Sequence, residues 1–376
     1  MRIAVNSAFL GDRSGGLTTY SLSVIDHLCQ CGEEVIVYAP DCVKLNGHPP
    51  TSKRNTPTAL CGSAGSVGNT LRAMAWCQTV LPVQLLRDRV DVFFSTTAEG
   101  MLLPVCPQVV VVHDLLPLFF PEEYPRWKFY FRHLLPRLLK SCRLVIAISD
   151  CTKQDLVREL KVPEERIEVV YNGVDPLFFS DDPGSPPAGF LLEPYFLFIG
   201  ASIPRKNLET VIRALAQIQN EIPHGLSCVL GLHDREKREY CSQMLELAAE
   251  LGIRKRLRVY SCLTQREILF LYRRATALVM LSQYEGFGYP PVEAMAVGTP
   301  AIVSDSTSLG EVSRPAAIGV PCMDVKASAE AMLRVATEAG YRRTLSDAGL
   351  RHAAKFTRDK CGRQILSILR HIGKRG

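Results

Sequence analysis

Two carboxylates that lie eight residues apart, Glu285 and Glu293, bound the segment of the chain whose residue types are best suited to chemistry. The segment reads Glu-Gly-Phe-Gly-Tyr-Pro-Pro-Val-Glu and follows a strand expected at Ala277–Leu281. Prolines suit the first turn of a helix, where a missing N–H group costs little, and the glycines allow close approach of the backbone. The amides around Gly288, Tyr289 and Val292 would then face an anion at the positive end of a helix.

The two glutamates are expected to play different parts. A glutamate in the first helical turn, Glu293, would be stabilised by the helix dipole and could accept two hydrogen bonds from a ribose diol. Glu285 lies on the preceding loop and is expected to point towards the mouth of a cleft. A helix cap with two surface glutamates is the alternative that these residues leave open.

A basic corner lies further towards the N-terminus, where residues 200–208 read Gly-Ala-Ser-Ile-Pro-Arg-Lys-Asn-Leu. The corner joins an expected strand to an expected helix, for which Asn207 is a good N-cap. Arg205 and Lys206 add positive charge there and could neutralise a departing diphosphate without a metal ion. A solvated basic turn is the alternative.

A histidine ends the expected strand Val109–His113, and Asp114 follows it. A lone histidine in such a place is more often structural than catalytic.

The pair Gly15 and Gly16 follows the first expected strand and opens a helix, where it could cradle a phosphate or admit an acceptor. The spacing is not G-x-G-x-x-G, so no nicotinamide cofactor is indicated.

The composition narrows the class of protein. With 376 residues, 47% of them hydrophobic and 22% charged, the chain suits a soluble enzyme of two domains. A net charge of +6 permits an anionic partner, but no basic run interleaves with aromatic residues as in nucleic-acid-binding motifs, so no nucleic acid is expected. Thirteen scattered cysteines with no CxxC or HExxH pattern indicate neither a metal site nor a redox pair. Their odd number, with no signal peptide, fits a cytoplasmic chain.

Short β-branched runs alternate with helical stretches along the chain, which predicts an α/β fold of two doubly wound, Rossmann-like domains facing a cleft. The Pro- and Gly-rich break at 179–189 is the best linker, so the domains are expected at 1–180 and 190–356. Residues of about 44–70 are expected to form a long loop. Helices are expected, among others, at Glu122–Lys140 and Val292–Ala296.

Residues 281–300 resemble the EX7E signature of glycosyltransferase family 4, a large family of retaining enzymes with the GT-B fold. The resemblance implies that Glu293 binds the nucleotide ribose and that Glu285 lies beside the donor sugar. It also implies that the backbone of Gly286, Phe287 and Gly288 holds the sugar hydroxyls, with Tyr289 following in the donor site.

The resemblance extends over nearly the whole chain. Lys206 resembles the family's phosphate clamp, whereas Ala201-Ser202 stands where many relatives carry an arginine, so Arg205 is a candidate for the second cation. The resemblance also implies that His113 contacts the donor sugar and that Asp114 orients its ring or the acceptor. Gly16, Gly200 and Ser202 complete the expected donor-binding set. The last helix, expected within 357–376, would return to the first domain.

The reaction implied by the resemblance is retaining transfer of a hexose to a glycan or lipid-linked acceptor in lipopolysaccharide or exopolysaccharide synthesis. GDP-mannose is the favoured donor. The chain has no D-x-D triplet, so no metal and no other cofactor are expected. Transfer of rhamnose or glucose from a dTDP or UDP donor, a sugar-nucleotide epimerase and a catalytically silent subunit of an assembly complex are the alternatives.

One basic and aromatic stretch has no role in the expected reaction. Residues 122–143 combine several arginines and lysines with Trp127 and Phe129, and such a helix can rest on an anionic bilayer. Peripheral contact with the inner face of the plasma membrane is therefore a hypothesis. A helix with one packed face and one solvated basic face is the alternative, and Pro136 is expected to interrupt or kink it.

Overall fold

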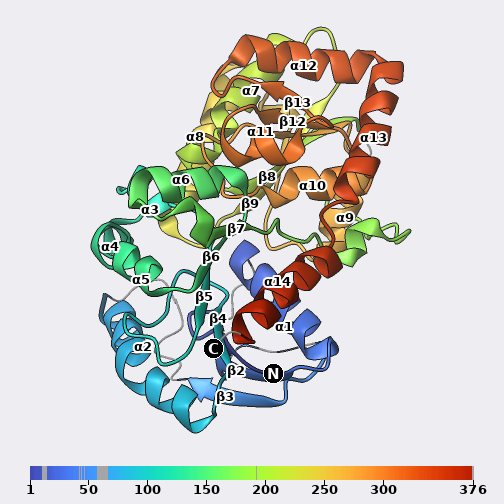
Figure 1. The fold of residues 1–376 in the computed structure, drawn as a ribbon. Helices are drawn as coiled ribbons and strands as arrows, with labels where there is room; N and C mark the ends of the chain where they lie inside the picture. The colour runs from blue at the N-terminus through green and yellow to red at the C-terminus, as the bar shows by residue number, and fades with distance from the viewer. Residues whose placement is uncertain are drawn as a thin grey trace. The chain divides into compact units, whose positions relative to one another are not determined.

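The chain forms two α/β units (Figure 1). The computed structural model describes residues 1–10, 15–41, 43, 45, 47–56, 67–191 and 193–374. Unit 1 is Met1–Gly173 together with Arg358–Gly376, and unit 2 is Val174–Thr357. Each unit has a parallel sheet with helices packed on it, so the α/β fold expected from the alternating pattern is confirmed.

Unit 1 has a seven-stranded parallel sheet in the order β3-β2-β1-β4-β5-β6-β7. The order reverses between β1 and β4, which is the arrangement of doubly wound folds. All five residues of β5 are buried, as expected for a valine-rich strand covered on both faces. The strands are β1 (Arg2–Asn6), β2 (Glu34–Pro40), β3 (Ser52–Thr56), β4 (Val92–Ser95), β5 (Gln108–Val112), β6 (Leu144–Ala147) and β7 (Ile167–Val169).

The helices of unit 1 include one from the far end of the sequence. That helix, α14, packs along α1, and a Cβ at Gly362 would lie only 2.2 Å from His27 Cγ (Figure 1). Arg370 of α14 also binds Glu33 with an N–O distance of 2.7 Å. The helical segments are α1 (Gly16–Gln30), α2 (Val67–Arg87), α3 (Leu116–Phe119), α4 (Pro125–Phe129), the π-helix η2 (Tyr130–Leu134), α5 (Leu135–Ser141), α6 (Asp150–Leu160), the 3-10 turn η3 (Glu164–Arg166) and α14 (Arg358–Gly373).

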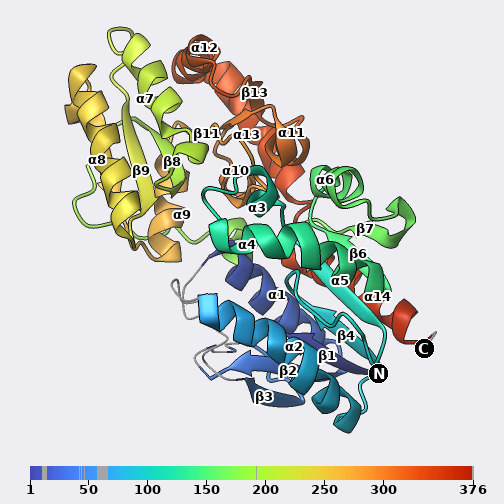
Figure 2. The same cartoon turned by 90° about the vertical axis from the view of Figure 1, so that its left-hand side faces the viewer.

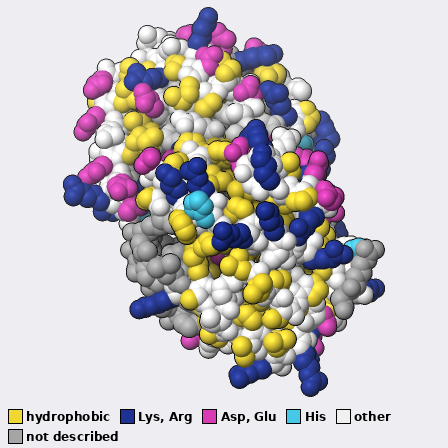
Figure 3. Space-filling model, turned by 60° about the vertical axis from the view of Figure 1, so that its left-hand side comes forward, with side chains coloured by type: hydrophobic (Ala, Val, Ile, Leu, Met, Phe, Trp, Pro, Cys, Tyr) yellow, Lys and Arg dark blue, Asp and Glu magenta, His cyan; other side chains and the backbone are white. Residues whose placement is uncertain are grey.

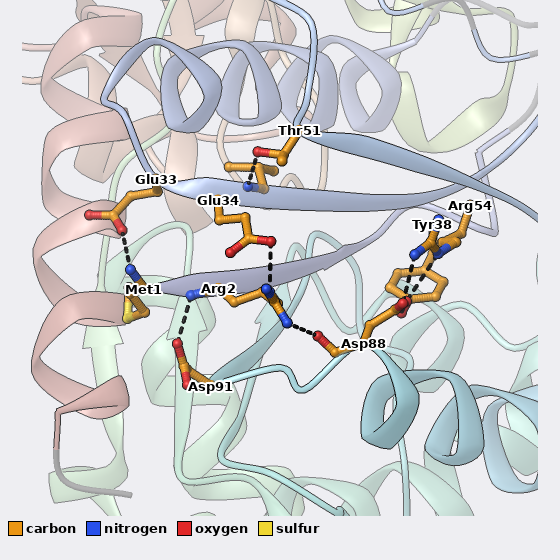
Figure 4. Close-up of polar contacts among 10 residues, drawn as sticks. Met1, Arg2, Glu33, Glu34, Tyr38, Thr51, Arg54, Asp88 and Asp91 are labelled. Carbon is orange, nitrogen blue, oxygen red and sulfur yellow. Dashed lines mark hydrogen bonds and ion pairs between the residues drawn. The ribbon is translucent and has the colours of Figure 1, made fainter.

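The expected long loop at about 44–70 is partly wrong, because it contains strand β3 and the first residues of α2. The sequence of β3, Ser-Lys-Arg-Asn-Thr, is polar because the strand lies at the sheet edge. Its Arg54 pairs with Asp88 at 2.6 Å, and Tyr38 of β2 donates to the same carboxylate at 2.7 Å (Figure 4). The Arg54 guanidinium lowers the pKa of Asp88. Residues 57–66 lie outside the described residues.

The expected helix Glu122–Lys140 is divided into three pieces. It begins at Pro125, and a π-helical turn at Tyr130–Leu134 separates α4 from α5. Pro136 is the second residue of α5 and has no N–H to donate to the preceding turn, which gives the irregular turn a physical cause. Among the described residues, no helix is long and apolar enough to cross a bilayer.

Unit 2 has a six-stranded parallel sheet in the order β10-β9-β8-β11-β12-β13, which reverses between β8 and β11. Figure 2 shows α7 and α8 lying along β8 and β9. The strands are β8 (Tyr195–Ala201), β9 (Gly225–Gly231), β10 (Leu257–Tyr260), β11 (Ala277–Met280), β12 (Ala301–Ser304) and β13 (Ile318–Val320). The helices are α7 (Leu208–Gln217), α8 (Arg235–Glu250), α9 (Gln265–Arg274), α10 (Tyr289–Ala296), α11 (Thr307–Ser313), α12 (Val325–Thr337) and α13 (Ala339–Ala353), with 3-10 turns η4 (Pro176–Phe179), η5 (Pro204–Lys206) and η6 (Arg254–Arg256).

The Pro- and Gly-rich segment 179–189 belongs to unit 2 and is fastened to α9. Ser185 N–H donates to the carbonyl of Arg266, and Arg266 pairs with Asp182 at 3.1 Å. Gly184 has φ +73°, and a Cβ there would lie 2.5 Å from the same Arg266 carbonyl oxygen. The turn-forming composition of this segment therefore serves close packing on a helix, and the division between the units falls at Gly173.

Candidate functional site

The loops after β8 and β11 meet at the carboxyl edge of the unit 2 sheet. These two strands are neighbours and mark the point where the strand order reverses. Their connections leave in opposite directions along the sheet, so a crevice at this edge is the usual ligand site of doubly wound folds. The first loop carries Ser202, Arg205 and Lys206, and the second carries Glu285 and Gly286.

Lys206 and Glu285 form an ion pair between the two loops, through Lys206 Nζ and Glu285 Oε1. Both side chains are mostly buried, with exposed fractions of 14% and 13%. The stem of Lys206 passes over Gly200, where a Cβ would lie 3.6 Å from Lys206 Cγ and Cδ. Ser308 of α11 donates to the carbonyl of Glu285 at 2.7 Å. Two expected site residues, from sequence positions 79 residues apart, are therefore held in direct contact.

Arg205 is fully buried, with an exposed fraction of 4%. Its Nη1 donates to the carbonyl of Tyr284 at 2.8 Å, while its own carbonyl accepts from Gln283 N–H at 2.9 Å. These bonds bind the loop after β8 to the residues just before Glu285. The geometry supports a positioning role for Arg205, in contrast to the expectation of a second cation facing the diphosphate.

Asn207 occupies the N-cap position of α7 in a left-handed conformation, with φ 58° and ψ 40°. Its side chain does not cap the helix backbone; Nδ2 donates to the carbonyl of Leu281 at 3.0 Å, and Oδ1 accepts from the Thr210 hydroxyl at 2.7 Å. The expectation of an ordinary N-cap is therefore wrong in its mechanism. Asn207 adds another bond between the same two loops.

Helix α10 begins at Tyr289, three residues before the expected start at Val292. Gly288 precedes it with φ +90°, and a Cβ there would lie 2.4 Å from Leu309 Cδ2, so glycine is required for conformation and for space. Because the helix begins earlier, Glu293 is its fifth residue and lies outside the first turn, which corrects the expectation of a dipole-stabilised carboxylate there.

Glu293 is held from a neighbouring helix. The hydroxyl of Tyr272 on α9 donates to Glu293 Oε2 at 2.8 Å, and burial together with this carboxylate raises the pKa of Tyr272. The tyrosine therefore stays protonated and fixes one carboxylate oxygen. Sequence reasoning missed Tyr272, since nothing in its own helix pattern distinguishes it from a core residue.

The remaining donor-site candidates of unit 2 surround these residues. Phe287 is buried and makes edge-to-face contacts with Tyr289, at 5.3 Å between ring centroids, and with Phe356, at 5.8 Å. Gly286 lies between the ion-paired Glu285 and this aromatic cluster. Ser202 is buried after β8, and its hydroxyl has no hydrogen-bond partner among the described residues.

In unit 1, His113 directly follows β5 at the carboxyl edge of the sheet. Its Nε2 lies 2.8 Å from the carbonyl of Thr96, so Nε2 carries the hydrogen and Nδ1 is left as an acceptor. Tyr20 of α1 packs edge-to-face on the ring at 4.8 Å. Burial lowers the pKa of His113 to about 4, so the imidazole is neutral at physiological pH. His113 is therefore built to accept a hydrogen bond.

The carbonyl of Thr96 holds the ring of His113, and the expectation that Asp114 orients this ring or the acceptor stays a prediction. Asp114 Oδ1 accepts from Leu116 N–H at 3.0 Å and so shapes the turn into α3. Gly16 is the first residue of α1, one turn before Tyr20, so α1 starts at the same sheet edge. Thr96 follows β4, and its place at a strand end was the signal available in the sequence.

Comparison with known proteins decides the family. A model described as Glycosyltransferase Family 4 matches residues 14–177, and one described as Glycosyl transferases group 1 matches residues 190–352. The chain belongs to glycosyltransferase family 4. It is similar to the O-antigen chain mannosyltransferase RfbU of Salmonella typhimurium, with 32% identity over 219 residues that cover 58% of each protein. It is also similar to O-antigen chain mannosyltransferase B of Escherichia coli, with 25% identity over 69% of each. The chain thus matches little more than half the length of the Salmonella protein.

Comparison with solved structures confirms the GT-B fold. The sucrose-phosphate synthase from Thermosynechococcus elongatus matches with a TM-score of 0.80 and 19% identity, covering all of both chains. HepE from Anabaena in complex with UDP and glucose matches with a TM-score of 0.76 and 18% identity, covering 99% of this chain and 100% of that one. At these identities the likeness concerns the fold alone.

Proposed function

We propose that the protein is a retaining glycosyltransferase that moves a hexose, with mannose from GDP-mannose favoured, to a glycan or lipid-linked acceptor in cell-surface polysaccharide synthesis. The observation that carries the proposal is the Lys206–Glu285 ion pair at the reversal point of the unit 2 sheet. The favoured sugar rests on the mannosyltransferases among the relatives.

In the proposed reaction, the bond between the sugar's anomeric carbon and the diphosphate oxygen breaks, and the acceptor hydroxyl forms the new bond from the same face. The proton of that hydroxyl passes to the oxygen of the leaving diphosphate. Lys206 and the start of α10 stabilise the negative charge that grows on the leaving diphosphate. Glu285 holds Lys206 in place before the donor binds and lies beside the donor sugar. No metal is required by this scheme.

Glu293 and Tyr272 serve the nucleotide in this proposal. The Tyr272 hydroxyl fixes Glu293 Oε2, so the other carboxylate oxygen is held ready for the ribose hydroxyls. His113 Nδ1 accepts a hydrogen bond from a sugar hydroxyl, which a neutral imidazole can do at physiological pH. Gly16 at the start of α1 leaves room for the donor or the acceptor.

Peripheral membrane contact through α4, η2 and α5 is proposed as a property of the same enzyme, and with it a cytoplasmic site at the inner face of the plasma membrane. Phe129 is 64% exposed, and the surrounding cations form no ion pair with any described residue. Figure 3 shows Lys and Arg side chains gathered beside hydrophobic ones on the face over α4 and α5. An exposed ring beside unpaired cations suits an anionic bilayer. The cations are Lys128, Arg132, Arg137, Lys140 and Arg143.

The donor is tested first by calorimetry of the whole chain with GDP, UDP, ADP and dTDP. We expect GDP to bind most tightly, and preference for UDP or dTDP would shift the proposal to glucosyl or rhamnosyl transfer. Incubation of labelled GDP-mannose with and without a saccharide acceptor then separates the activities: product that forms only with the acceptor supports transfer. Turnover without an acceptor would support an epimerase, and binding without turnover a silent subunit.

Membrane contact is tested by flotation with vesicles of phosphatidylcholine and phosphatidylglycerol at low salt. We expect the protein to float with these vesicles and not with phosphatidylcholine alone. The variant Lys128→Gln with Arg132→Gln should lose flotation, whereas Arg351→Gln with Lys355→Gln, which removes the same charge from α13 and the turn after it, should keep it. Equal flotation of all three proteins would refute this contact surface.

A further inference from the structure

A second concave site lies at the opposite edge of the unit 2 sheet from Lys206 and Glu285. Its cavity of about 650 Å³ is lined by residues that directly precede the strands β8, β9, β11 and β12. Lys206 and Glu285 follow the carboxyl ends of β8 and β11. Since a strand rises about 3.3 Å per residue, the seven residues of β8 alone separate the two edges by roughly 20 Å.

The lining of this cavity is strongly basic. Four arginines contribute to it, and it includes no aspartate or glutamate among the described residues. Along the chain, Glu193, Glu338 and Asp347 each adjoin a lining residue, and Glu338 is engaged with Arg334 at 3.2 Å. The cavity therefore holds a positive charge of four that its own walls do not neutralise. The four arginines are Arg273, Arg274, Arg342 and Arg343.

The arginines are held in place by contacts that leave donors available. Arg342 Nη1 donates to the carbonyls of Val335 at 3.0 Å and Ala336 at 3.3 Å, and Arg273 Nη2 donates to the carbonyl of Ser180. The Arg274 guanidinium lies over the Phe270 ring at 5.6 Å. Because a guanidinium has five N–H donors, these contacts orient each group without exhausting it.

The start of α13 adds to the positive field. Ala339 lines the cavity as the first residue of this 15-residue helix, and no acid stands in its first turn. Arg342 and Arg343 follow within the next turn, where the helix dipole disfavours cations. An anion in the cavity would satisfy both the helix start and the two arginines.

A buried histidine supplies the second, independent observation. His224 lines the cavity with an exposed fraction of 8%, and its Nδ1 has no hydrogen-bond partner among the described residues. Its Nε2 lies 3.1 Å from the Thr276 hydroxyl. If that hydroxyl donates to Nε2, then Nδ1 carries a hydrogen that has no acceptor among the described residues. Burial, Arg342 and Arg256 all lower the pKa of His224, so its surroundings are net positive.

We propose that this cavity binds a phosphate-bearing anion with at least two negative charges, at a site distinct from the proposed donor site. Paired guanidinium groups, a helix start and an imidazole N–H are the groups that recognise phosphate oxygens. The ligand is either a soluble phosphorylated molecule or the phosphate headgroup of a lipid. The binding chemistry of the two sources is the same, and it does not depend on the transfer reaction.

The test uses the whole chain and inorganic pyrophosphate, measured by calorimetry. The variant Arg274→Gln with Arg343→Gln removes two exposed cations and leaves the backbone contacts of Arg273 and Arg342 intact. We expect it to bind pyrophosphate at least about tenfold more weakly, which corresponds to one lost charge-assisted hydrogen bond. The control Arg351→Gln with Lys355→Gln removes the same charge outside the cavity and should bind like the unchanged protein.

The variant Lys206→Ala distinguishes binding at the proposed donor site from binding in the basic cavity. Lys206→Ala should weaken binding of a nucleoside diphosphate and leave the pyrophosphate affinity of the basic cavity unchanged. Binding of pyrophosphate that is weakened by Lys206→Ala and unaffected by Arg274→Gln with Arg343→Gln would overturn the proposal, because the anion would then occupy the donor site alone.

Vesicles of phosphatidylcholine with phosphatidic acid distinguish the two sources. If the cavity variant loses pyrophosphate binding but floats like the control, the ligand is a soluble phosphate compound. If it loses flotation as well, a lipid headgroup is the source.

The ring signals of His224 give a separate readout: we expect pyrophosphate to raise the pKa of His224 by offsetting the charge of Arg342. An unchanged titration of His224 at saturating pyrophosphate would contradict the site.

Discussion

The ammonium of Lys206 and the carboxylate of Glu285 are joined in an ion pair that links the loops after β8 and β11. Water screens neither charge strongly, since both side chains are mostly buried. A diphosphate that binds at this edge of the sheet must therefore share Lys206 with Glu285 or displace it. A change to either residue should therefore alter this competition.

Replacement of Lys206 by alanine should remove the cation that stabilises the leaving diphosphate. We expect kcat to fall by about 10²- to 10³-fold, the loss typical of one oxyanion-stabilising group, or about 2.7–4 kcal/mol. Steady-state transfer assays measure the loss. Lys326→Ala removes an exposed lysine of α12 and should leave kcat unchanged. Normal transfer by Lys206→Ala would remove Lys206 from the mechanism.

Replacement of Glu285 by glutamine should separate binding from turnover. The amide keeps the size of the side chain but no longer neutralises Lys206, so the nucleoside diphosphate should bind at least as tightly as before. The rate should fall, since the group beside the donor sugar has lost its charge. Calorimetry and single-turnover transfer measure the two quantities. A variant that binds the diphosphate more weakly and turns over normally would contradict the competition for Lys206.

Replacement of Arg205 by methionine should destabilise unit 2 and displace Glu285. The buried carbonyl of Tyr284 would lose its donor, which costs on the order of 1–3 kcal/mol. Denaturant unfolding and transfer assays should both detect the change. Arg213→Gln removes an exposed ion pair with Glu209 and should cost less than about 1 kcal/mol. If Arg205→Met were as stable as the unchanged protein but inactive, a direct role at the diphosphate would replace the positioning role.

The neutral state of His113 predicts a pH dependence of stability. In the unfolded chain the imidazole gains a proton near pH 6.5, whereas burial lowers its pKa to about 4 in the folded protein. The folded state thus binds fewer protons in this window, and stability should fall as pH decreases from about 6.5 to about 4. His113→Gln, which can still donate to Thr96, should flatten this slope. Thermal unfolding at several pH values tests this, and an identical slope in the variant would exclude His113 as its source.

The raised pKa of Glu99, also in unit 1, predicts a pH dependence of stability opposite to that of His113. Burial raises the pKa of Glu99 to about 7, because its effect exceeds that of Thr97, whose hydrogen bond lowers the pKa. The folded state therefore binds the extra proton, so stability should fall as pH rises from about 4.5 to about 7. Replacement of Glu99 by glutamine should remove a cost to the folding free energy on the order of 1–3 kcal/mol at pH 8. At pH 4 it should change the stability little. A variant less stable than the unchanged protein at pH 8 would contradict the predicted ionisation.

The fold class and the chemical character of the site follow from local sequence patterns. Alternating β-branched and helical stretches require parallel sheets with helices packed on them, because such strands are buried on both faces. Glycines and prolines between Glu285 and Glu293 mark a tight approach to a helix start. Lys206 and His113 could be placed at strand ends by local pattern alone. The polar edge strand β3 and the first residues of α2 escaped this reasoning, since their patterns resemble a loop.

Long-range packing determines which of these residues are in contact and what each can do. Arg205 and Lys206 are neighbours in the sequence with the same charge, yet one is buried against Tyr284 and the other is paired with Glu285. That difference arises because consecutive side chains leave the η5 turn in different directions, and the strand order β8-β11 brings the second loop to their side. The same long-range packing supplies Thr96 to His113 and Tyr272 to Glu293, which no local spacing encodes.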